Sequence, residues 1–141
     1  MSLKQERKDR GVTLIELLVV MTILAILAAL VVPRLFKSLE KSKIDAAKAQ
    51  ISAFETALDA YRLDVGSYPS TDQGLQALRV APPGIQNWDG PYLPKTIPAD
   101  PWGHPYLYRS PSSHGGYEIV SLGPTGRAGG TGLNAEIDSW K

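Results

Sequence analysis

The chain has 141 residues, of which 15 are basic and 14 acidic, and it lacks the basic patch or stripe that marks a nucleic-acid-binding protein. It has no cysteine, which excludes disulfides and thiol chemistry. Glycine and proline are concentrated in the second half, where 12 of the 13 glycines lie at or after Gly66 and 10 of the 11 prolines at or after Pro69. The sequence therefore predicts an uninterrupted first half, followed by a region of turns and short elements.

Residues 12–34 are predicted to form a transmembrane helix. The run from Val12 to Val32 is apolar except for Thr13, Glu16 and Thr22, and about 20 apolar residues span a bilayer as a helix. The remaining soluble part, roughly 110 residues, could hardly enclose a helix that is apolar on every face. A cleaved secretory signal has a shorter apolar core and an A-x-A-like site, whereas the alanines of residues 25–30 have the wrong spacing. Four basic residues precede the run and four closely follow it, so the positive-inside rule leaves the orientation undecided.

Residues 35–65 are predicted to continue this helix as an amphipathic segment that ends before Gly66. Apolar side chains recur there at steps of three and four, which places them on one helix face: Ile44, Ala47, Ile51, Phe54, Leu58, Tyr61 and Val65. The one breaker in the predicted helix is Pro33, which lacks a backbone donor and crowds the carbonyl of Ala29. Two interpretations of Pro33 stay open: a passive kink at the membrane boundary, and a weak point where the helix can unwind.

Short elements are expected in residues 66–141. The sequence predicts a short helix at 73–79 and two strands, rich in aromatic and β-branched residues, at 106–109 and 117–122. The loop 110–116 contains one proline and two glycines and would join the strands as a hairpin. We expect this hairpin to pack on the apolar face of the 35–65 helix.

Motifs for catalysis or cofactor binding are weak. The stretch "GTGLNA" at 130–135 fits the dinucleotide fingerprint G-x-G-x-x-A, but that motif needs a βαβ unit of about 30 residues, for which there is no room after Ala135. His104 and His114 lie among turn residues and have no cysteine partners, so we expect them to face solvent rather than bind a metal. No nucleophile elbow is present. The sequence thus favours a protein that is not an enzyme.

The stretch "RGVTLIELLVVMTILAILAALVVPR" at 10–34 resembles the class III signal of type IV pilins and their relatives. The resemblance implies that residues 1–11 are a leader peptide, which a prepilin peptidase removes on the cytoplasmic side by cutting between Gly11 and Val12. It also implies methylation of the new amino terminus at Val12, a position that the family usually fills with phenylalanine or methionine.

Glu16 is the one carboxylate in the apolar run. A carboxylate at bilayer depth costs a few kcal/mol unless it is paired. Cleavage would free an α-amine on Val12, one helical turn away, and pairing with an amine of the same or a neighbouring copy would offset that cost. The alternative is a carboxylic acid near the interface that stays protonated. We expect Glu16 to serve filament assembly, together with Pro33 if the helix unwinds there.

Three later stretches look like the major pseudopilins of type II secretion systems: "YRLDVGSYPSTDQGLQAL" at 61–78, "DPWGHPYLYRSP" at 100–111 and "GYEIVSLG" at 116–123. The resemblance implies an α+β, type IV pilin-like fold, in which one long N-terminal helix packs on a small antiparallel sheet with extended loops. It implies a single-pass protein of the bacterial inner membrane whose globular part, residues 66–141, is periplasmic.

The function that this resemblance implies is structural: the subunit polymerises with itself into a periplasmic pseudopilus that drives protein export. The implied partners are a prepilin peptidase, minor pseudopilins and an inner-membrane assembly platform with a separate ATPase. A subunit of another pilin-like filament, either a surface pilus or a competence pseudopilus, is the nearest alternative. The alternative from a different class is a signal-anchored periplasmic enzyme.

The resemblance also implies a calcium-binding loop. In major pseudopilins the loop that corresponds to residues 123–132 usually holds calcium with aspartates and backbone carbonyls, and it often reads GADG where this chain has GPTG. Thr125 therefore stands where an aspartate ligand would be, and the candidate ligands that remain are the Leu122 carbonyl, Glu136 and Asp138. We expect a degenerate or weakened calcium site and no other cofactor.

Overall fold

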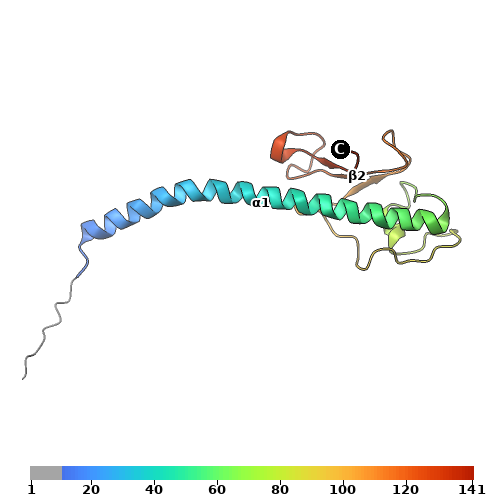
Figure 1. Ribbon diagram of the computed structural model, residues 1–141, viewed down its shortest axis with the longest axis horizontal. Coiled ribbons are helices and arrows are strands. Elements are labelled where there is room, and N and C mark those ends of the chain that lie inside the picture. Colours follow the sequence, from blue (N-terminus) through green and yellow to red (C-terminus); the bar gives the residue numbers. More distant parts are fainter. Residues whose placement is uncertain (1–10) are drawn as a thin grey trace, which may run out of the picture. The chain divides into compact units, whose positions relative to one another are not determined.

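The computed structural model describes residues 11–141; residues 1–10, which make up the implied leader apart from Gly11, lie outside the described range. Its elements are helix α1 (Leu14–Val65), the 3₁₀ turn η1 (Leu75–Leu78), strands β1 (Leu107–Arg109) and β2 (Glu118–Ser121), the 3₁₀ turn η2 (Gly132–Asn134) and strand β3 (Ile137–Asp138). The chain divides into two compact units, the first ending at Ser38 and the second comprising Leu39–Lys141. Figure 1 shows that α1 is one continuous helix that contributes to both units.

The first unit holds the apolar part of α1. From Val12 to Phe36 its large hydrophobic side chains are exposed, from 88% for Leu14 down to 44% for Val32. A contiguous apolar surface of this extent marks a membrane or partner interface. Within residues 11–141, α1 is the one helix that is long and apolar enough to cross a membrane.

The second unit is organised around the apolar face of α1. The side chains buried on this face follow the predicted spacing: Ala47, Ile51, Phe54, Ala57, Leu58 and Tyr61. Ile44 and Val65, at the two ends of the stripe, are partly buried. Phe54 is fully buried and meets the ring of Tyr106 edge-on, with 5.1 Å between the ring centroids. Full burial of a large apolar side chain stabilises a fold by about 1.5–3 kcal/mol, so this stripe is a main source of stability.

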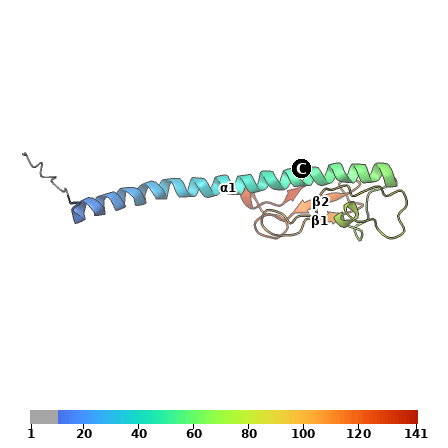
Figure 2. The same ribbon diagram turned by 90° about the horizontal axis from the view of Figure 1, so that it is seen from below.

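A three-stranded antiparallel sheet in the order β1-β2-β3 lies beside the later part of α1 (Figure 2). Tyr108 of β1 is opposite Ile119 of β2, and Ser121 of β2 is opposite Ile137 of β3. Ile119 and Ile137 are buried in one core with the helix stripe. The predicted hairpin and its packing on the helix are therefore confirmed. The strands are one to two residues shorter than predicted, and the helix predicted at 73–79 is a four-residue 3₁₀ turn.

Strand β3 was not predicted. It has two residues, Ile137 and Asp138, which is too short to show an alternating pattern. Its position is fixed by the next residue, since the backbone N–H of Ser139 donates to the Ile119 carbonyl at 2.9 Å and the Ile119 N–H donates to Ser139 Oγ at 3.0 Å.

A buried carboxylate, Asp100, joins the loop 100–104 to the sheet. Its Oδ1 accepts hydrogen bonds from the backbone N–H of Trp102 at 3.1 Å and of His104 at 2.8 Å, and its Oδ2 accepts one from the Ser121 hydroxyl at 2.8 Å. Asp100, a residue that is 4% exposed, thus has each carboxylate oxygen satisfied, as a buried carboxylate requires. From the same loop, the Trp102 indole donates to Glu40 Oε2 of α1 at 3.1 Å.

Candidate functional site: the start of α1 and the β2–β3 loop

Helix α1 begins at Leu14, two residues beyond the implied cleavage position between Gly11 and Val12. Thr13 is its N-cap, because its Oγ1 accepts a hydrogen bond from the Glu16 N–H at 3.2 Å and its carbonyl accepts one from the Leu17 N–H at 3.1 Å. Gly11 and Val12 precede the helix. The capping role of Thr13 was not predicted, although the T-x-x-E pattern of a capping box marks it in the sequence.

Glu16 lies in the first turn of α1 and is exposed. The N-terminal end of a helix carries partial positive charge, which stabilises a nearby carboxylate by about 0.3–1 kcal/mol. Val12 is 74% exposed and lies just before the cap. An α-amine on Val12 and the carboxylate of Glu16 would therefore share one helix end, and both would be accessible to another copy of the chain.

Pro33 lies inside α1 and does not end it. Because proline has no N–H, the carbonyl of Ala29 lacks its helical donor. Pro33 follows Glu16 by 17 residues, or about 25 Å of helix, so these two predicted residues form separate sites.

The calcium candidates of the loop between β2 and β3 do not form a common ligand set. The Thr125 hydroxyl is used locally, accepting from the Arg127 N–H at 3.3 Å and lying 3.4 Å from the Arg127 carbonyl. Glu136 Oε2 accepts a hydrogen bond from the Gly129 N–H at 3.0 Å. The Asp138 side chain is buried, and its Oδ2 lies 2.5 Å from the ammonium of Lys141.

Calcium needs six to eight oxygen ligands and favours several carboxylates. Within residues 11–141, no three His, Cys, Asp or Glu side chains come together. Leu122, which is half-buried, can offer calcium only its backbone carbonyl. The donor set of this loop therefore does not fit calcium.

The two histidines occupy different settings. His104 is half-buried against the β2–β3 loop, where a Cβ added at Gly126 would lie 3.0 Å from its Nε2. His114 is exposed, and its ring stacks on Trp140 with 4.0 Å between centroids. His114 is exposed as expected, although its ring packs on Trp140, and His104 is packed more closely than the sequence indicated.

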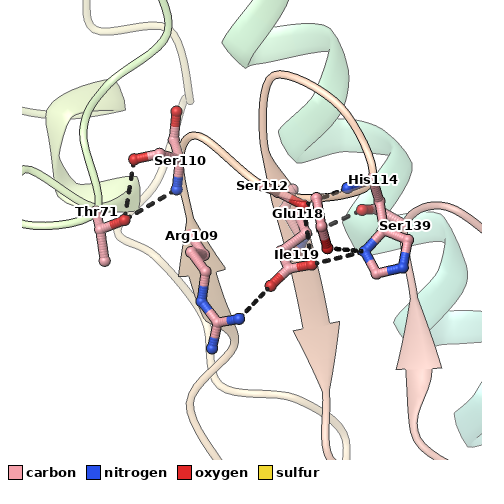
Figure 3. Close-up of polar contacts among 9 residues, drawn as sticks. Thr71, Arg109, Ser110, Ser112, His114, Glu118, Ile119 and Ser139 are labelled. Atoms are coloured by element: carbon pink, nitrogen blue, oxygen red, sulfur yellow. Dashed lines mark hydrogen bonds and ion pairs between the residues drawn. The ribbon is translucent and has the colours of Figure 1, made fainter.

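A polar cluster on the β1–β2 hairpin surrounds Glu118 (Figure 3). One oxygen of this buried carboxylate lies 2.9 Å from Arg109, and the other lies 3.1 Å from His114 Nδ1 and accepts from the Ser112 hydroxyl at 3.0 Å. The hydrogen bond from His114, with smaller contributions from Ser112 and Arg109, holds the pKa of the Glu118 carboxyl below its usual range. The cluster lies within one hairpin and pairs the Glu118 carboxylate with Arg109, His114 and Ser112.

Two family profiles match the chain. The profile described as "Prokaryotic N-terminal methylation motif" matches residues 7–32, and the one described as "Type II secretion system (T2SS), protein G" matches residues 34–140. The chain belongs to the type II secretion system protein G family. The methylation motif includes Gly11, Val12 and Glu16, whose individual roles remain predictions.

Individual members of the protein G family match over nearly the whole chain. The type II secretion system core protein G of Pseudomonas aeruginosa is 45% identical over 139 residues, which cover 96% of this chain and 98% of that protein. The Vibrio cholerae protein of the same name is also 45% identical, over 141 residues that cover 98% of this chain and 96% of the relative.

The same family supplies a solved structure. The crystal structure of the major pseudopilin from the type 2 secretion system of enterohaemorrhagic Escherichia coli matches with a TM-score of 0.65 at 33% identity, covering 77% of this chain and 95% of that one. The predicted type IV pilin-like fold, with one long helix packed on a small antiparallel sheet, is thereby confirmed.

Proposed function

We propose that this protein G family member is the structural subunit that polymerises into a periplasmic pseudopilus and drives protein export through a type II secretion system. The observation that carries the proposal is an exposed apolar helix start joined to a separately packed second unit, in a chain matched to protein G over residues 34–140. A filament subunit needs both parts, because the apolar segment must be held first by lipid and then by neighbouring copies.

Processing is the first step of the proposed pathway. A prepilin peptidase cuts between Gly11 and Val12 and methylates the freed amine of Val12. The amine keeps its charge after methylation, so the carboxylate of Glu16 retains a cationic partner. Support comes from the methylation-motif match over residues 7–32 and from the Thr13 cap, which leaves the cleavage position outside the helix.

Before assembly the subunit crosses the inner membrane once through residues 12–34, with its globular part in the periplasm. The chain itself has a structural and not a catalytic role, so the energy for assembly comes from a separate ATPase at an inner-membrane platform. Minor pseudopilins are the other expected partners. Because the exposed apolar surface of the first unit covers the helix all round, many copies can pack in a filament core.

The proposal is tested by co-producing the full chain with a prepilin peptidase in a bacterial membrane and measuring the intact mass. The expected product is residues 12–141 with one added methyl group, and a Gly11→Leu variant provides the unprocessed control. An uncut mass, or a cut near Ala29, would contradict the proposal.

A second experiment separates the pseudopilus from other pilin-like filaments. The chain is produced in a Pseudomonas aeruginosa strain that lacks its own core protein G, the 45% identical relative. We expect restored export of secreted proteins, together with filaments in electron micrographs after overproduction. Filaments without restored export would favour a surface pilus or competence filament instead.

A further inference from the structure

The loop between β2 and β3, residues 122–136, is where the fold family implies a calcium ion and where this chain's donor set does not fit one. The loop is nevertheless held in a defined conformation, with bonds that reach from its middle to its end.

We propose that the chain's own groups take the place of the metal: the Glu136 side chain closes the loop on Gly129, and the Lys141 ammonium supplies the positive charge that Asp138 requires. The folded state of this subunit is then independent of calcium.

Glu136 binds both backbone groups of Gly129. Its N–H donates to the Gly129 carbonyl at 2.9 Å, and its Oε2 accepts from the Gly129 N–H at 3.0 Å. Hydrogen bonds to an ionised carboxylate are stronger than those between neutral groups. The two bonds form a closed ring between residues seven positions apart. The carboxylate thus acts as a clasp across the loop, which is the role of a bridging ion.

The loop backbone approaches residues 134–135 directly. Gly130, at φ 87°, lies so close that a Cβ there would collide with the Asn134 carbonyl oxygen. At Gly123, with φ 72°, a Cβ would lie 2.7 Å from the Ala135 carbonyl oxygen. Both positions require glycine for space and for backbone conformation. The two sides of the loop therefore meet backbone to backbone.

Asp138 needs a cation because its side chain is 0% exposed. A buried carboxylate without a partner is strongly destabilising. The Lys141 ammonium lies 2.5 Å from Asp138 Oδ2 and balances the charge of this carboxylate. The hydrogen bond to Asp138 raises the pKa of Lys141 above its usual value of 10.5.

The test compares melting temperatures of the full chain in detergent micelles, followed by near-UV circular dichroism. One sample contains calcium at about 1 mM, the weak end of the range for extracellular calcium modules, and the other contains excess chelator. We expect the same melting temperature in both. A melting temperature that rises in calcium and falls in chelator, with magnesium inert, would overturn the proposal.

Variants then identify the clasp. Glu136→Ala should lower the melting temperature equally in calcium and in chelator, while Asp72→Ala, an exposed carboxylate outside the loop, should change it little. If the melting temperature fell only in the calcium sample, Glu136 would be a metal ligand. If it fell in neither sample, Glu136 would not hold the loop closed. Either result would overturn the proposal.

A milder variant covers the case in which Glu136→Ala does not fold. Glu136→Gln keeps the side-chain shape and an acceptor oxygen but loses the charge. Hydrogen exchange of the peptide that contains Gly129 should then accelerate, with exchange in the α1 stripe around Phe54 unchanged. Unchanged exchange at Gly129 would contradict the proposal.

Discussion

The indole Nε1 of Trp102 donates a hydrogen bond to Glu40 Oε2 at 3.1 Å, which joins the loop 100–104 to the first turn of the second unit's helix segment. Glu40 also lies 3.6 Å from Lys43, so its carboxylate serves both the loop and the helix. Asp100 joins the same loop to the sheet through Ser121. Along α1 from its N-terminal end, Glu40 is the first residue to which a side chain of this loop bonds.

We therefore expect Trp102→Phe to lower the free energy of unfolding by about 1 kcal/mol, because the ring still packs while the donor is lost. The measurement is chemical denaturation followed by circular dichroism. Glu40→Gln keeps an acceptor oxygen and should cost less. Equal stability of Trp102→Phe and the wild type would show that the contact contributes nothing.

The packing of α1 on the sheet depends on Phe54, which is fully buried against Tyr106. Phe54→Ala should lower the free energy of unfolding by about 3–5 kcal/mol, because it removes apolar contacts and leaves a cavity. Leu63→Ala is the matched control on the same helix, since Leu63 is 86% exposed, and it should change stability by about 0.5 kcal/mol at most. Similar losses for the two variants would contradict the assignment of the packed face.

The Glu118 cluster predicts a pH dependence of stability. Because the pKa of Glu118 is lowered in the folded state from its usual value of 4.5, its contribution is fully present above about pH 4.5 and is lost as the pH falls through the folded value. Glu118→Gln should therefore be less stable than the wild type at neutral pH, and the difference should shrink in acid. Denaturation series between about pH 3 and 7 measure this, with the exposed Asp72→Asn as control. If the stability difference between Glu118→Gln and the wild type grew in acid, the pairing of Glu118 with its neighbours would be refuted.

Glu16→Leu should leave folding, membrane insertion and leader cleavage intact but abolish long filaments. The substitution makes the span more apolar, so insertion should be as good or better. In the filament, however, the charged amine of Val12 would lose its carboxylate partner, and breaking a desolvated pair costs about 3–5 kcal/mol at each subunit contact.

The Glu16 experiment scores processed protein by immunoblot and filaments by electron microscopy. Glu16→Asp should be partly tolerated, because its shorter arm keeps the charge but reaches less far. Thr22→Leu, which also increases the apolarity of the same span, separates the loss of charge from the change in hydrophobicity. Normal filaments from Glu16→Leu would show that the pair with the amine is not the reason for this glutamate.

How far the sequence predicts the structure depends on how local each signal is. The stripe from Ile44 to Val65 repeats over six helical turns, so helix α1 and its buried face follow directly from periodicity. The hairpin is also local, since its turn residues lie between its two strands. The Thr13 cap was local too, and the T-x-x-E pattern would have identified it.

The missed features are those that arise from distant contacts. Strand β3 exists because Ser139 bonds to Ile119, 20 residues away, and two residues carry no pattern of their own. The Gly129–Glu136 clasp likewise depends on a loop conformation that no short motif specifies. A candidate calcium ligand in the sequence, Glu136, thus belongs in the structure to a hydrogen-bonded ring.

The burial of Ile51 and Ile137 in one core also governs the order in which the subunit can fold. These residues are 86 positions apart, so the stripe on α1 is synthesised long before the strand that packs with it. Native contacts of such long sequence separation form slowly, and uncovered apolar surface is prone to aggregate in the meantime. Folding of this chain should therefore benefit from a chaperone that shields the stripe until the last strand has been made.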